Sequence, residues 1–235
     1  SSWYKRTYNV ERTTSEVLPL IGSKEGIMHV SMAFLNVGDS VLVPNPGYPT
    51  YTSVSKLMRA NVIAYDVLES DNWIPDFDAL EQMDLSGVKL MWVNYPNMPT
   101  GANSSYELFE KLVAFGKKHS IVICHDNPYS FILTDKPRSI LEIEGAKDIC
   151  IELNSMSKSH NMAGWRMGML ASNEQFVNWV LRVKSNVDSG QFRPMQMAAI
   201  KALEAPMQWH ENMNLLYEQR RIWAFKIMTL LGCKF

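Results

Sequence analysis

Residues 154–168, NSMSKSHNMAGWRMG, gather polar and basic side chains suited to covalent chemistry on a carbonyl group. Lys158 has Ser155 three residues before it and Arg166 eight residues after it. A lysine becomes a nucleophile that forms Schiff bases when burial and cationic neighbours lower its pKa. The sequence around Lys158 therefore predicts a site that accepts an aldehyde. The alternative is that Lys158 is a solvated surface residue, as most lysines are.

A carboxylate and a phenol follow the next apolar run upstream. Residues 121–124 lead into Asp126 and Tyr129, which places both at the carboxyl end of an expected strand. An Asp in this position often only caps a helix. As a functional residue, Asp126 would hold a cationic ring nitrogen.

A glycine-flanked segment, GSKEG at residues 22–26, precedes an apolar stretch that is typical of a helix. Free backbone N–H groups at a helix start attract anions, so a phosphate is expected near Ser23 and Lys24. A phosphate, an aldehyde and a pyridine nitrogen together describe pyridoxal 5′-phosphate, which acts as an electron sink for carbanions.

The elements that position these residues alternate between strand and helix. Short runs rich in β-branched residues predict strands at residues 41–43, 62–65, 90–94, 121–124, 149–153 and 167–171. Residues 105–119 predict a helix, with Ser104 and Glu107 as its capping box. The alternation predicts an α/β fold with a mostly parallel central sheet flanked by helices, and ligands beyond the carboxyl ends of the strands.

The last third of the chain is mainly helical, with helices expected at residues 173–184, 195–204 and 208–231. No repeat, low-complexity tract or flexible linker divides the chain, so we expect one domain over residues 1–235.

The balance of charged residues indicates which kinds of partner the chain binds. The 235 residues are 46% hydrophobic, with 23 basic against 24 acidic residues, and no run of like charges suggests nucleic acid or a membrane surface as a partner. No apolar stretch reaches the roughly 18 residues of a spanning helix, so we expect a cytoplasmic protein. Neither the three scattered cysteines nor His125 and His160 have the spacing of a metal site.

Five blocks give the chain a family resemblance. They are GSKEG at 22–26, NPGYPTY at 45–51, NYPNMPTGA at 94–102, HDNPYS at 125–130 and SMSKSHNMAGWRMG at 155–168. In this order they resemble the pyridoxal-phosphate aminotransferases of class I and II, which have fold type I. The resemblance implies a homodimeric transferase of amino acid metabolism, which moves an amino group between an α-amino acid and a 2-oxo acid.

The resemblance also assigns roles to residues. Lys158 would form the internal aldimine and move the proton, Asp126 would pair with the ring nitrogen, and Tyr129 would bond the phenolic oxygen. Tyr48 would stack on the ring. The residues implied in cofactor binding are Ser23, Lys24, Tyr48, Asn97, Asp126, Tyr129, Ser155, Lys158 and Arg166.

The sequence departs from the family pattern in two places. Met98 stands where the family usually has an Asn that donates to the cofactor's phenolic oxygen, and a thioether cannot donate. We also expect residues 1–235 to be the large domain only, with residues 208–235 leading to a small domain that supplies the arginine for the substrate carboxylate. Arg193 is a candidate for substrate or subunit contact, and equally for the surface.

Several readings stay open. Another reaction of the same cofactor, such as a C–S β-lyase reaction, uses the same scaffold. A domain that binds the cofactor without turnover is the alternative from a different class. The sequence does not identify the amino acid substrate, for which aspartate is the first guess.

Overall fold

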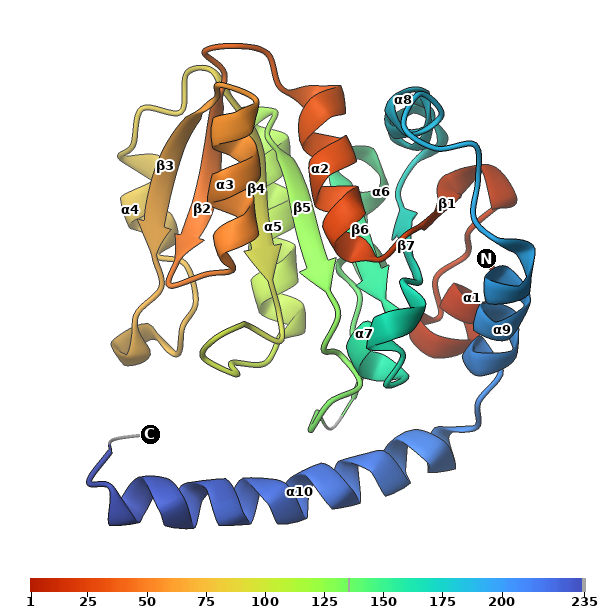
Figure 1. Ribbon diagram of the computed structural model, residues 1–235. Coiled ribbons are helices and arrows are strands. Elements are labelled where there is room, and N and C mark those ends of the chain that lie inside the picture. Colours follow the sequence, from red (N-terminus) through yellow and green to blue (C-terminus); the bar gives the residue numbers. More distant parts are fainter. Residues whose placement is uncertain (135, 234–235) are drawn as a thin grey trace.

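The computed structural model describes residues 1–134 and 136–233 (Figure 1). Within them, seven strands form one sheet in the order β1-β7-β6-β5-β4-β2-β3. The strands are β1 (Val17–Leu20), β2 (Ser40–Asn45), β3 (Asn61–Asp66), β4 (Val88–Asn94), β5 (Val122–Asn127), β6 (Cys150–Ser155) and β7 (Gly168–Ala171). The five strands from β2 to β6 are parallel, whereas β7 is antiparallel to both of its neighbours. The predicted α/β class with a mostly parallel sheet is confirmed.

The helices follow the strands in the expected alternation. They are α1 (Ser2–Tyr8), α2 (Ser23–Phe34), α3 (Pro49–Leu57), α4 (Phe77–Glu81), α5 (Tyr106–His119), α6 (Ala146–Ile149), α7 (Met156–Ser159), α8 (Glu174–Lys184), α9 (Arg193–Leu203) and α10 (Met207–Leu230). Short 3₁₀ turns occupy Thr14–Glu16, Glu69–Asp71, Ile140–Glu142 and Ala163–Trp165.

The sheet separates two apolar clusters, because successive residues of a strand face opposite sides. Met91 and Ile123 pack on one side with residues of α1, α4, α5 and α6. Trp92 and Cys124 pack on the other side with residues of α2, α3 and α8. With both faces covered, the carboxyl ends of β4, β5 and β6 are left to form a site (Figure 1).

Two local predictions were wrong. The apolar pattern did not predict β1, a four-residue edge strand that contains Pro19, which an edge position tolerates. The α5 helix is capped by Ser105 and not by Ser104, since the Ser105 hydroxyl oxygen accepts the Leu108 N–H at 3.0 Å. The first error concerns pairing with β7, about 150 residues away in the sequence, and the second a hydrogen bond within one turn; apolar periodicity reports neither.

The long helix α10 runs beneath the carboxyl ends of the strands (Figure 1). Its first turns are anchored: His210 is buried with its ring 4.4 Å from that of Phe131, and the Asn214 amide donates to the Phe131 carbonyl oxygen at 3.0 Å. Farther along, Trp223 is 64% exposed and Leu230 is 87% exposed. Only the beginning of this helix is packed on the sheet domain.

Candidate active site

A cavity of about 420 Å³ opens where the carboxyl ends of β4, β5 and β6 meet the start of α2 and the one-turn helix α7. Eight of the nine residues predicted to bind a cofactor line it: Ser23, Lys24, Tyr48, Asp126, Tyr129, Ser155, Lys158 and Arg166. These residues come from segments up to 143 positions apart in the sequence. The fold therefore gathers the predicted residues at one place, at the sheet edge where ligands of such folds bind.

Asn97 lies outside this group and does not line the cavity. It is buried, and its side-chain oxygen accepts the Thr100 hydroxyl at 2.9 Å and the Thr100 N–H at 3.3 Å. Its backbone exchanges hydrogen bonds with Gly101 and Ala102. Asn97 shapes the turn, and the neighbouring Met98 presents its side chain to the cavity instead.

Asp126 is the buried carboxylate of the cavity, 4% exposed. The Tyr51 hydroxyl donates to its Oδ2 at 2.9 Å. Its Oδ1 is buried and has no hydrogen-bond partner among the described residues. Burial raises the pKa of Asp126 to about 6, against the opposing effects of the Tyr51 hydrogen bond, the His125 charge and Ser23. A buried acceptor oxygen without a donor fits a protonated ring nitrogen.

The start of α2 forms a cradle for an anion. Its N-cap residue is Gly22, at φ +80°, and no side chain caps the first turn, so its backbone N–H groups are free for a ligand. A Cβ atom at Gly22 would lie 2.5 Å from Nη2 of Arg166. Glycine at this position thus lets the guanidinium of Arg166 lie against the helix start, where both groups favour a phosphate.

Lys158 stands on α7, whose first turn is capped by the Ser155 hydroxyl oxygen accepting the Ser157 N–H at 3.2 Å. The Ser159 hydroxyl donates to the Ser155 carbonyl oxygen at 2.9 Å and tightens the turn. The sequence predicted a buried lysine, but Lys158 is exposed at the cavity wall. Among the residues that the structure describes, no carboxylate forms an ion pair with its amine, which is therefore available to a ligand.

Two phenols and a second lysine complete the wall. The Lys24 amine lies 5.5 Å from the centre of the Tyr48 ring. Burial alone would raise the pKa of Tyr48, but hydrogen bonds with Thr50 and Lys24 outweigh burial and lower it. Burial raises the pKa of Tyr129, and the nearby Asp126 carboxylate adds to the effect. The two tyrosines thus differ in acidity within one cavity.

Two residues of the cavity wall were missed by the sequence analysis. Tyr51 stacks on Trp92, with ring centres 5.1 Å apart and planes at 3°, and holds Asp126. Asn94 donates to the Asp126 carbonyl oxygen at 2.8 Å and accepts the Met98 N–H at 2.7 Å. Tyr51 could have been found, since it follows Tyr48 by three residues at a helix start and so shares its face.

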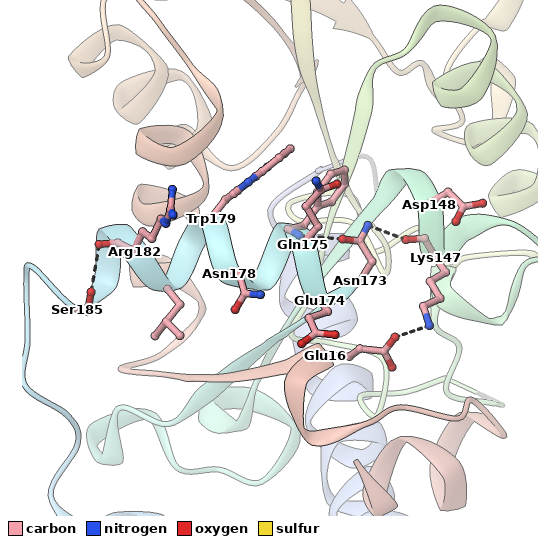
Figure 2. A pocket seen from close by; sticks show the side chains of 12 residues that line it. Glu16, Lys147, Asp148, Asn173, Glu174, Gln175, Asn178, Trp179, Arg182 and Ser185 are labelled. Carbon is pink, nitrogen blue, oxygen red and sulfur yellow. Dashed lines mark hydrogen bonds and ion pairs between the residues drawn. The ribbon is translucent and has the colours of Figure 1, made fainter.

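A second and larger hollow, of about 1140 Å³, lies over α8 (Figure 2). Its polar side chains bind one another: Lys147 pairs with Glu16, and the Asn173 amide donates to the Lys147 carbonyl oxygen at 3.0 Å. It contains none of the predicted site residues. The smaller cavity, with its unpartnered carboxylate oxygen, is the better candidate site.

The sequence profile of the family described as "Aminotransferase class I and II" matches residues 1–233. The chain belongs to this family. The predicted family membership is confirmed, and the cavity lies on the residues of the five motif blocks that carried the resemblance.

Two curated relatives carry the same description. An LL-diaminopimelate aminotransferase of Dehalococcoides mccartyi is 44% identical over 224 residues, which cover 94% of this chain and 58% of the relative. That of Aquifex aeolicus is 43% identical over 232 residues, covering 97% and 59%. The chain thus spans less than two thirds of the length of these relatives.

Solved structures agree with the fold. A substrate-bound BacF structure from Bacillus subtilis has a TM-score of 0.89 at 39% identity, covering 93% of this chain and 56% of that one. An aminotransferase from Staphylococcus aureus has a TM-score of 0.93 at 30% identity, covering 100% and 62%.

Two features are absent from the described residues. None of their helices combines the length and apolarity needed to cross a bilayer. No three His, Cys, Asp or Glu side chains lie close enough together there to hold a metal ion.

Proposed function

We propose that this chain carries the pyridoxal 5′-phosphate site of an aminotransferase, which moves an amino group between an α-amino acid and a 2-oxo acid. The observation that supports this most directly is the Oδ1 atom of Asp126, buried in the cavity wall and without a donor among the described residues. The amine of Lys158, without a carboxylate partner among the described residues, and the anion cradle at the start of α2 lie in the same cavity. These three features fit the ring nitrogen, aldehyde and phosphate of one cofactor.

When bound, this cofactor supplies an aldehyde for amines and a ring that withdraws electrons from the substrate carbon. Asp126 would hold the ring nitrogen as a cation, and Tyr129 would donate to the phenolic oxygen. The backbone of Ser23 and Lys24, the Ser155 hydroxyl and the Arg166 guanidinium would hold the phosphate. Tyr48 would cover the ring face. The Lys158 amine would take and return the proton at the substrate carbon, as a general base and acid.

The substrate that we propose is an amino acid of the diaminopimelate type, because the relatives at 43–44% identity carry that description. This replaces aspartate as the first substrate to test. We also propose that the chain acts in a cytoplasmic homodimer, as the resemblance implies.

Binding without turnover is the second candidate. It is favoured by Met98, which lines the cavity and places a thioether where the family usually has a hydrogen-bond donor. The chain would then hold the cofactor with Tyr129 alone at the phenolic oxygen. Adding LL-diaminopimelate to the loaded chain separates the candidates, because only an aminotransferase converts the bound cofactor to its pyridoxamine form.

The first experiment is to load the chain with pyridoxal 5′-phosphate, reduce it with borohydride and map the modified peptide. We expect the cofactor on Lys158, and we expect Lys158→Ala to lose it entirely. Lys201→Ala is the matched control, because Lys201 is an exposed lysine of α9 outside the cavity and should not affect labelling. A reduced adduct that persists in Lys158→Ala would refute the assignment.

A further inference from the structure

A buried pair of ionisable side chains joins β5, the strand that carries Asp126, to β6. His125 and Glu152 are both 0% exposed, and Nδ1 of His125 lies 3.0 Å from Oε2 of Glu152. They are directly opposite in the register of the two strands. Neither side chain lines the cavity, and none of the roles proposed above uses them.

Glu152 is a carboxylate because donors surround it. Its Oε1 accepts the Tyr4 hydroxyl at 2.8 Å and the Asn154 amide at 2.9 Å. Besides His125, its Oε2 accepts the Ser139 hydroxyl at 2.9 Å and the Ile140 N–H at 3.1 Å. The Tyr4 and Ser139 hydroxyls each accept another N–H, which directs their own protons to Glu152. Burial would raise the pKa of Glu152, but the His125 contact and the other hydrogen bonds outweigh it and lower the pKa.

His125 then carries a proton on each ring nitrogen. Its Nε2 lies 2.9 Å from the Tyr95 carbonyl oxygen, which can only accept a hydrogen bond. Its Nδ1 faces the Glu152 carboxylate, which also only accepts. Two N–H groups make the ring an imidazolium, and the edge of Phe109 packs against it with ring centres 4.9 Å apart.

The positive member of this pair is the chain neighbour of Asp126. His125 directly precedes Asp126 in β5, with its side chain on the opposite face of the sheet, whereas Glu152 lies one strand away. We propose that His125 is a positioning residue whose buried positive charge keeps Asp126 in the carboxylate form that a cationic ring nitrogen requires. The proposal rests on the proposed function for the role of Asp126.

Other groups also face Asp126, and they limit how much the His125 charge can change its protonation. Tyr51 of α3 and Ser23 of α2 bind the carboxylate, and the titratable groups of the cavity wall are Lys24, Tyr48, Tyr129, Lys158 and Arg166. Burial raises the pKa of Asp126 to about 6 even though the His125 charge lowers it. Without that charge the pKa of Asp126 would be higher still. A charge acts strongly here because both side chains are buried and solvent screens their interaction little.

The first test reads the ring of His125 itself. In the ¹⁵N-histidine-labelled chain at pH 7.5, the nitrogen shifts of His125 are expected to show two protonated nitrogens, assigned by their loss in His125→Gln. If that variant does not fold, His125 is assigned through its contact with Phe109. A neutral ring with one bare nitrogen at this pH would overturn the proposal.

The second test reads Asp126 through the ¹³C shift of its carboxyl carbon as a function of pH. His125→Gln is expected to raise the pH at which Asp126 loses its proton by about one unit, a tenfold change in proton affinity. Phe109→Leu is the matched control, because it loosens the packing around the same ring without changing its charge, and it should leave this pH unmoved. An unmoved Asp126 in His125→Gln, or equal shifts in both variants, would contradict the proposal.

Both tests need neither cofactor nor turnover. If the chain bound no pyridoxal 5′-phosphate, the proposed function would fail while both measurements could still give the expected result. If the chain bound pyridoxal 5′-phosphate and the two measurements gave the contradicting results, only the role of His125 would be refuted.

Discussion

Two buried carboxylates in neighbouring strands behave in opposite ways. Asp126 in β5 faces the cavity with one oxygen unpartnered among the described residues, and burial raises its pKa to about 6. Glu152 in β6 is fully buried, yet its pKa is lowered, because five donors surround it. Burial therefore does not decide which carboxylate keeps its proton. The number of hydrogen bonds offered to the charge decides it.

The hydrogen bonds of Glu152 lie within the fold, whereas Asp126 faces a cavity. Glu152 ties α1, β5 and the turn at Ile140–Glu142 to its strand, so its hydrogen bonds are used within the fold. Asp126 has one oxygen without a donor among the described residues, so its buried charge destabilises the chain unless a cation binds there.

The largest effect is expected from Glu152→Gln. The change places an amide among donors and leaves the buried His125 charge without an anion, so we expect a loss of about 3–5 kcal/mol in the free energy of unfolding. Denaturant unfolding at pH 7 measures it. A loss of less than about 1 kcal/mol would mean that the carboxylate is not the centre of this network.

Asp126→Asn should act in the opposite direction. Since the pKa of Asp126 is raised to about 6 when folded and is near 3.9 when unfolded, its charge costs about 3 kcal/mol above pH 6, and this cost disappears as the pH falls from about 6 to about 4. Without cofactor, the variant should thus be more stable than the wild type at pH 7 by up to about 3 kcal/mol, and equally stable at pH 4. Unfolding at the two pH values checks this, and a variant less stable at pH 7 would contradict it.

The smallest effects come from removing single hydroxyl donors, in Tyr51→Phe and Ser139→Ala. Each should cost about 1 kcal/mol. Tyr51→Phe should also raise the pKa of Asp126, because it removes the hydroxyl donor to Oδ2, while stacking on Trp92 is kept. Ser139→Ala should leave Glu152 ionised at pH 7, since four donors remain. Carboxyl ¹³C shifts followed against pH would measure the pKa of Asp126 in Tyr51→Phe and of Glu152 in Ser139→Ala. Equal pKa changes in the two variants would contradict the difference between the two carboxylates.

Much of the fold and site could be predicted from the sequence. Apolar runs located six of the seven strands in the described residues, and Lys158, Asp126 and the segment at Ser23 were recognised by residue type and position. The Glu152 network escaped, because it depends on contacts such as that between Tyr4 and Glu152, 148 residues apart. The exposure of Lys158 also escaped, since burial depends on what packs over a loop rather than on its sequence.

The anchoring of α10 has a mechanical consequence. Its fixed point is a cluster of rings in which His160 stacks on Trp209 and meets His210 edge to face. His160 lies two residues after Lys158 in the sequence, so the ring cluster that fixes the start of this 24-residue helix is joined directly to the turn that carries Lys158. A force on the exposed part of α10 would therefore act, through this ring cluster, on the turn that carries Lys158.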